Sequence, residues 1–241
     1  MATDPLLSAL QQIGALKKEC LGLLDRLKQF SPPDTNGKYP DTFRLMATPM
    51  FYSVWERCFT ICHAVALRLI REVTDKTGNL DPSLRAIWLA PTSFYQSLTS
   101  QIRNEGHLSE EKRIRKGHFA ILCDFLPKFD TWLRSGLDET VNTDTLVMTF
   151  SNVNPDVVMA NARSIGIDEY PQFQALRLGR LHDLVGQRND IGHGAVIEPP
   201  TNDSFSALLT FTENLVADYC DLFVEWMPTF ANTVELEITS A

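Results

Sequence analysis

The chain has 241 residues, of which 44% are hydrophobic and 22% charged, and this composition excludes disordered, collagen-like and low-complexity proteins. Its formal net charge of −8 argues against bulk-charge binding of nucleic acid or an anionic membrane, although a local basic site remains compatible with it. No apolar run approaches the roughly 18 residues of a membrane span, and residues 1–10 lack the basic start of a signal peptide. We therefore expect a cytoplasmic protein with no membrane partner.

Hydrophobic spacing predicts helices throughout the first half of the chain. Leucines and isoleucines recur at three- to five-residue steps between Leu6 and Leu27, and Ser31-Pro32-Pro33 ends this helix. The next helix carries a long, broad apolar face and is therefore expected to be central. In the last helix of this half, Phe119, Leu122, Phe125 and Leu126 are expected to face inward. The predicted helices cover residues 5–30, 49–74, 92–103 and 109–133.

The second half of the chain begins with a weak pattern and then becomes helical again. Residues 145–150 fit either a short strand or extended chain. Helices are expected over 156–165, 172–189 and 202–226, with Asn202-Asp203-Ser204 capping the last. No β-α alternation or glycine-rich phosphate loop is present, so the predicted class is all-α, a bundle of about six or seven helices. We expect an N-terminal extension (1–48), a helical domain (49–228) and a loose tail (229–241).

The five cysteines include one suggestive pair. Cys58 and Cys62 are one helical turn apart and His63 follows them. A zinc site needs about four ligands, and the sequence contains no second pair. We therefore expect buried, reduced thiols and predict neither a metal nor a cofactor.

A dense polar cluster ends the helix that is predicted over 172–189. Arg188, Asn189, Asp190 and His193 lie within six residues, and Gly192 and Gly194 flank the histidine. Arginine and histidine are favoured at helix C-termini for electrostatic reasons alone, so an ordinary helix cap is one interpretation. A functional site is the other. Arg188 and His193 are about 140° apart around an ideal helix, so they converge only if the helix ends or bends, or if a second subunit completes the site.

The segment Arg188-Asn189-Asp190-Ile191-Gly192-His193-Gly194 resembles the Arg-x4–6-His motif of the HEPN superfamily, the higher eukaryotes and prokaryotes nucleotide-binding domains. The preceding residues 181–185 are similar to the helix that leads into that motif. Residues 150–155 and Ser53-Val54-Trp55-Glu56 resemble two earlier elements of one prokaryotic subgroup. The resemblance covers roughly residues 51–226.

The resemblance implies a metal-independent endoribonuclease, often a toxin or an effector of antiphage defence. In such an enzyme His193 would deprotonate the 2′-OH of RNA, and Arg188 would bind the phosphate and its developing charge. Asn189 would orient His193 or bind phosphate, whereas Asp190 either pairs with a neighbour or faces solvent. The family pattern also implies a homodimer with one shared cleft, and an antitoxin or defence-system protein as a partner.

Other charged residues could be either functional or structural. Glu56 either pairs with an arginine in the core or lines the cleft. Two groups of basic residues either contact RNA or form solvated helix faces. They are Arg177 with Arg180, and the run that contains Lys112, Arg115 and Lys116. Two other functions remain open, namely a non-catalytic HEPN module that binds RNA, nucleotides or a protein, and an unrelated helical regulator.

Overall fold

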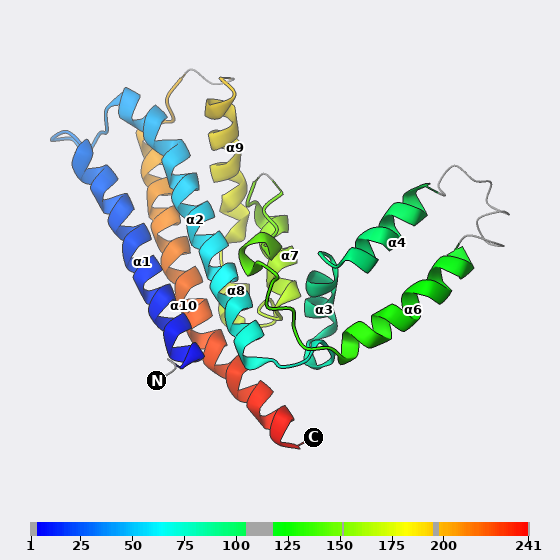
Figure 1. Ribbon diagram of the computed structural model, residues 1–241. Helices are drawn as coiled ribbons and strands as arrows, with labels where there is room; N and C mark the ends of the chain where they lie inside the picture. Colours follow the sequence, from blue (N-terminus) through cyan, green and yellow to red (C-terminus); the bar gives the residue numbers. More distant parts are fainter. Residues whose placement is uncertain (1–3, 105–117, 151, 195–197, 241) are drawn as a thin grey trace. The chain divides into compact units, whose positions relative to one another are not determined.

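A computed structural model describes the chain except for residues 1–3, 105–117, 151, 195–197 and 241 (Figure 1). Within the described residues there are nine α-helices and no strands, which confirms the all-α class. The count exceeds six or seven because several helices are short. The chain divides into two compact units, unit 1 with residues 1–70 and 143–241, and unit 2 with residues 71–142.

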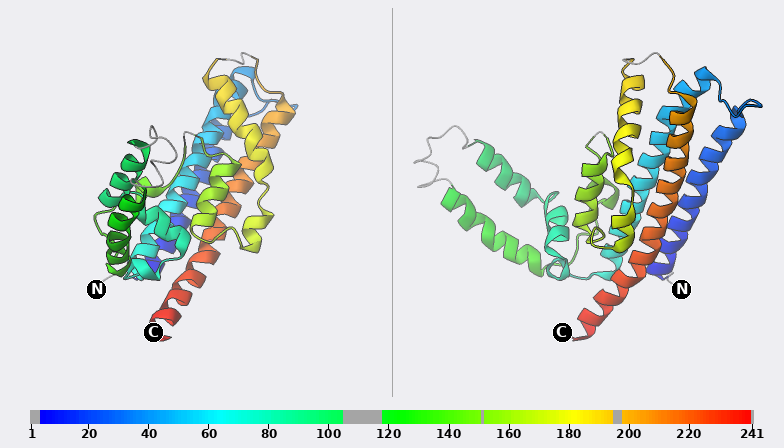
Figure 2. Two further views of the ribbon diagram at one scale, coloured as in Figure 1. Left: turned by 90° about the vertical axis from the view of Figure 1, so that its right-hand side faces the viewer. Right: turned by 180° about the vertical axis from the view of Figure 1, so that it is seen from behind.

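Three long helices form the centre of unit 1 and lie side by side (Figures 1 and 2). They are α1 (Pro5–Phe30), α2 (Asp41–Val73) and α10 (Asn202–Ser240). α2 is the most buried, as its broad apolar face predicts. Its aromatic side chains pack against those of α10, and His63 hydrogen-bonds the Tyr219 hydroxyl at 2.8 Å. Burial lowers the pKa of His63 to about 3, so this imidazole is a neutral core residue.

Prolines lie inside two of these helices without ending them. α2 begins at Asp41 and continues through Pro49, because Ala47 and Phe51 on either side are both buried against the bundle. α10 continues through Pro228 to Ser240, where a loose tail was expected from residue 229. Met227 and Ala231 are buried on either side of that proline. Tertiary packing therefore outweighs the hydrogen bond that each proline removes.

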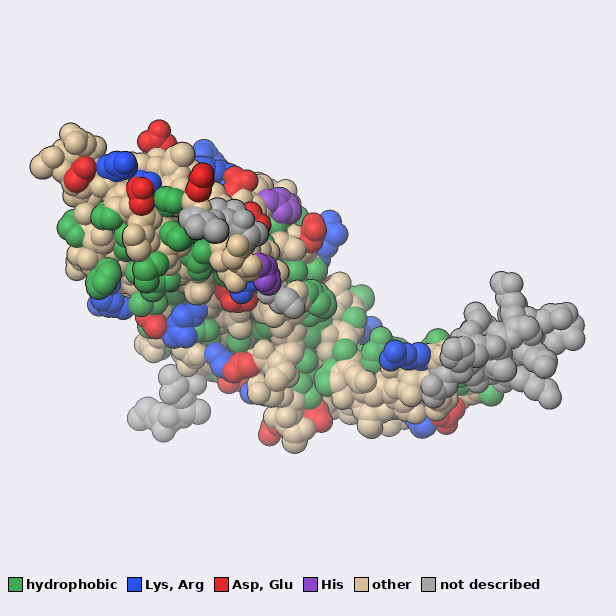
Figure 3. Space-filling view, turned by 90° about the horizontal axis from the view of Figure 1, so that it is seen from above, with side chains coloured by type: hydrophobic (Ala, Val, Ile, Leu, Met, Phe, Trp, Pro, Cys, Tyr) green, Lys and Arg blue, Asp and Glu red, His purple; other side chains and the backbone are tan. Residues whose placement is uncertain are grey.

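Charged side chains of both signs share the surface. On the face seen from above, lysine and arginine side chains are interspersed with aspartate and glutamate (Figure 3). Within the described ranges, no helix is both long enough and apolar enough to cross a membrane.

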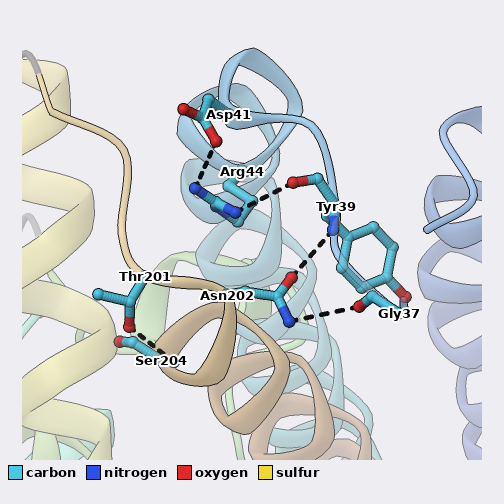
Figure 4. Close-up of polar contacts among 7 residues, drawn as sticks. All are labelled: Gly37, Tyr39, Asp41, Arg44, Thr201, Asn202 and Ser204. Atoms are coloured by element: carbon cyan, nitrogen blue, oxygen red, sulfur yellow. Dashed lines mark hydrogen bonds and ion pairs between the residues drawn. The ribbon is translucent and has the colours of Figure 1, made fainter. Parts of the chain in front are cut away.

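The loop between α1 and α2 is fixed to the start of α10 (Figure 4). The Asn202 side chain accepts a hydrogen bond from the Tyr39 backbone N–H at 2.9 Å and donates one to the Gly37 carbonyl at 3.3 Å. The helix cap is instead Thr201, whose hydroxyl accepts the Ser204 backbone N–H at 3.2 Å. Asn202, expected as a cap residue, thus serves a long-range contact.

Between residue 142 and α10, the main departure from the predicted helices is a break in the helix expected over 172–189. A 3-10 turn (Thr143–Leu146) overlaps the start of residues 145–150, for which a strand or extended chain was expected, and residues 147–149 form neither helix nor strand. α7 (Pro155–Ser164) begins as predicted, with Asn154 accepting the Val157 N–H. The helix predicted over 172–189 is broken, because Leu176 is extended, with ψ 129°. The result is α8 (Pro171–Ala175), a 3-10 turn (Leu178–Arg180) and α9 (Leu181–Gly192).

Unit 2 contains a 3-10 turn (Thr77–Asn79), α3 (Pro82–Leu89), α4 (Ser93–Asn104) and α6 (His118–Arg134). α4 and α6 pack together through aromatic rings, with Phe94 contacting Phe125 and Trp132. The expectation that Leu122 and Leu126 face inward is wrong, since they are 48% and 57% exposed. Phe125, which was expected to face inward as well, packs against Phe94. The side chain of Phe119 lies outside the described residues.

Candidate functional site

Arg188 is held on the inner side of α9 by its neighbours in sequence and in space. Leu184 and Val185, one turn earlier, are buried and fix that face of the helix toward the core. The Arg188 Nη1 donates to Asn189 Oδ1 at 2.8 Å and to Asn152 Oδ1 at 3.3 Å. The guanidinium carbon lies 5.0 Å from the centre of the Tyr52 ring, a cation–π contact.

Tyr52 connects Arg188 to α2 and to the segment before α7. Its hydroxyl accepts the buried Val153 N–H at 2.7 Å and donates to Glu56 Oε1 at 3.2 Å. Trp55 Nε1 donates to the Val153 carbonyl at 3.2 Å, so α2 holds both polar groups of that residue. Burial, with the Glu56 carboxylate nearby, raises the pKa of Tyr52 to about 12, and the phenol therefore stays protonated at neutral pH.

The structure brings Glu56, Arg188 and Asn189 together, and it adds two partners that sequence reasoning did not assign. Tyr52 and Asn152 lie within or beside segments that resemble the prokaryotic subgroup, yet neither was singled out. Their positions in the sequence could have indicated them. Tyr52 precedes Glu56 by one helical turn and therefore shares its helix face, and Asn152 lies two residues before the cap residue Asn154.

His193 is the residue that closes α9. Its backbone N–H donates to the Asn189 carbonyl at 2.9 Å, and Gly194 follows with φ +69°, a conformation that favours glycine. The His193 side chain is exposed. The segment is therefore a helix cap and a polar cluster at once, and the two sequence interpretations do not exclude each other.

Asp190 faces away from Arg188. It is exposed and lines a hollow of about 400 Å³ together with Arg180, Asp183 and Gln187. Asp190 follows Arg188 by two positions, so the two side chains point about 200° apart around the helix axis. The structure thus places Asp190 outside the Arg188 cluster.

The other predicted basic residues lie elsewhere. Arg177 and Arg180 line a hollow of about 630 Å³ against α10, and the Arg180 guanidinium carbon is 5.8 Å from the centre of the Phe211 ring. Asp218 also lines this hollow, so the site is not uniformly basic. The run that contains Lys112, Arg115 and Lys116 lies outside the described residues.

An all-α fold with an Arg-x4-His segment at a helix end defines the class, a HEPN domain. A family model described as RiboL-PSP-HEPN matches residues 15–225, and the chain therefore belongs to this family. The match includes most of α1 as well as unit 2. HEPN domains include ribonucleases, bind RNA and often form dimers. Comparison with curated proteins gave no significant match, and comparison with solved structures gave none either.

Proposed function

We propose that this protein is a metal-independent endoribonuclease of the toxin or antiphage-defence type. The observation that carries the proposal is the way in which the Arg188 guanidinium is hydrogen-bonded. Both of its hydrogen bonds within the described part of the chain use Nη1. Nη2 and Nε can therefore meet the two oxygens of a phosphate, while Tyr52 and Asn152 hold the group in place.

The proposed chemistry uses His193 together with Arg188. A neutral imidazole accepts the proton of the RNA 2′-OH, and the oxygen attacks the adjacent phosphorus. The bond to the 5′-oxygen breaks, which leaves a 2′,3′-cyclic phosphate and a 5′-OH end. Arg188 stabilises the charge that develops on the phosphoryl oxygens. Asn189 acts on Arg188, which it contacts at 2.8 Å, and positions that group.

Helix geometry supports a two-chain site. The bond from the His193 N–H to the Asn189 carbonyl spans four residues, so helical geometry persists up to His193. Arg188 and His193 of one chain therefore remain about 140° apart around α9. A two-fold pairing of α9 helices would bring His193 of one protomer to Arg188 of the other, and would supply a second histidine to protonate the leaving oxygen.

The test is cleavage of a short RNA with a labelled 5′ end by the full chain in EDTA. We expect the parent to cut, and Arg188→Ala and His193→Ala to lose about 10²–10⁴ in rate while they keep the parent's melting temperature within a few degrees. Two matched controls should cut normally: His182→Ala, an exposed histidine on the same helix, and Arg163→Ala, an exposed arginine of α7.

Three outcomes would overturn the proposal. Folded Arg188→Ala and His193→Ala chains that cut at the parent rate would leave the motif as a helix cap only. RNA bound without cleavage would favour a non-catalytic HEPN module. Cleavage that EDTA abolishes and that Mg²⁺, but not Zn²⁺, restores would indicate a different mechanism.

A further inference from the structure

Four cysteines that are scattered in the sequence meet inside unit 1. Cys20 comes from α1, Cys58 and Cys62 from α2, and Cys220 from α10, and all four are 0% exposed. The Cys58 and Cys220 sulfurs are 3.6 Å apart. The sulfurs of Cys58, Cys62 and Cys220 all lie within 4.8 Å of one another, and the Cys20 side chain interacts with that of Cys58.

The sequence contains no second cysteine pair beside Cys58 and Cys62, but the fold brings two further cysteines to them. Cys58 and Cys62 share one face of α2 because they are four residues apart. α1 and α10 pack along each other and each add one thiol at the same level of the bundle. The second pair therefore consists of Cys20 and Cys220, which are 200 residues apart in the sequence.

We propose that these four thiols bind one Zn²⁺ ion as thiolates, in a structural centre that joins α1, α2 and α10. A zinc–sulfur bond of about 2.3 Å in a tetrahedron requires sulfurs about 3.8 Å apart. Among Cys58, Cys62 and Cys220, the sulfur separations of 3.6 Å to 4.8 Å need only small rotations of the side chains to reach that value. Cys20 lies outside this group of three but beside Cys58, and its side chain would have to turn toward the other sulfurs to become the fourth ligand. Four thiolates match the ligand set of structural zinc, whereas an open catalytic site would keep a water position.

The charged groups nearest the cluster occur as ion pairs. Binding releases four thiol protons and leaves a formal charge of −2 on the complex. Lys17 and Asp221 lie near Cys220, and Glu19 and Arg57 lie near Cys20, so each end of the cluster faces one cation and one carboxylate. Both cations are held by ion pairs that cross between helices, Lys17 with Asp221 at 2.7 Å and Arg57 with Glu19 at 3.0 Å. These ion pairs are partly exposed, whereas the four cysteines themselves are fully buried.

The centre would be separate from the Arg188 cluster. Tyr52 and Glu56 lie on a different face of α2 from Cys58 and Cys62. Each of the two cysteines follows one of these residues by six positions, which is a rotation of about 240° around the helix axis. The proposal therefore does not depend on ribonuclease activity, and either idea can fail alone.

The experiment starts with the full chain, purified under reducing conditions without a chelator. We expect elemental analysis to find about one zinc per chain. Titration of the reduced, metal-free chain with Co²⁺ should give the visible absorption of tetrahedral thiolate coordination, and added Zn²⁺ should remove that absorption by displacement. Zn²⁺ should also raise the melting temperature of the metal-free chain.

Variants assign the ligands. Cys58→Ala and Cys220→Ala should lose the bound zinc and the Co²⁺ spectrum, and Cys20→Ala should weaken binding and change the spectrum. Cys123→Ala, which removes the exposed cysteine of unit 2, is the matched control and should bind like the parent. A metal-free parent that takes up no Co²⁺ would overturn the proposal, whether or not any variant folds. Unchanged binding in folded Cys20→Ala or Cys58→Ala would overturn the four-thiolate site.

Discussion

Replacement of Tyr52 by phenylalanine separates the structural from the chemical role of the Arg188 cluster. The change keeps the ring under the guanidinium and therefore preserves the cation–π contact. It removes the hydroxyl that accepts the Val153 N–H at 2.7 Å and donates to Glu56. Tyr52 is 1% exposed, so water cannot readily replace that oxygen.

The expected cost comes mainly from the Val153 amide. A buried N–H without an acceptor destabilises the folded state by about 1–3 kcal/mol. Glu56 is only half-buried and can turn toward water, so its lost donor adds little. We therefore expect the free energy of unfolding of Tyr52→Phe to fall by about 1–3 kcal/mol at neutral pH. RNA cleavage below the melting transition should stay near the parent rate, because Arg188 keeps its ring contact.

The pH dependence provides an independent check. Because the folded-state pKa of Tyr52 is raised from 10 to about 12, its contribution to stability is complete below pH 10 and is lost as the pH rises through 12. The stability difference between parent and Tyr52→Phe should therefore narrow across that interval, by up to about 1.4 kcal/mol for each pH unit.

Urea unfolding followed by circular dichroism at pH 7.5 and at pH 11 measures both effects. Tyr170→Phe is the control, because Tyr170 is half-buried and its hydroxyl makes no hydrogen bond within the described residues. It should change stability by less than about 0.5 kcal/mol. A similarly small effect for Tyr52→Phe would refute the reasoning, as would a stability difference that does not change between the two pH values.

Three further predictions concern single contacts. Arg188→Lys should lower the rate of RNA cleavage by about 10²–10³ with little change in melting temperature, because lysine keeps the charge and loses the planar fork; a parent-like rate would mean that charge alone suffices. Asn161→Ala should cost about 1–3 kcal/mol in urea unfolding, since its buried amide bonds the Met148 N–H and the Met148 and Val157 carbonyls; a neutral result would contradict that bonding. Gly78→Ala should speed amide hydrogen exchange in unit 2, because its Cβ would lie 2.8 Å from the Leu133 carbonyl oxygen; unchanged exchange would show that the backbone there yields freely.

The sequence by itself determined the helical class and the position of the polar cluster. Both depend on local spacing, because residues three and four apart share a helix face whatever the rest of the chain does. The cap at Asn154 followed from the same local rules, and they placed the end of the helix at Asn189, three residues before α9 ends at Gly192. Even Glu56 could be proposed, because it stands in a segment that resembles an early helix of the family.

Only the tertiary structure decided features that depend on distant neighbours. Packing carried α2 through Pro49 and α10 through Pro228, although local rules favour an end at proline. The contacts of Tyr52 and Asn152 with Arg188 join residues that are 136 and 36 positions apart in the sequence. Cys20 and Cys220 reach the Cys58 pair in the same way. Such contacts leave no periodic trace in the sequence, because they are set by how helices pack rather than by how each helix forms.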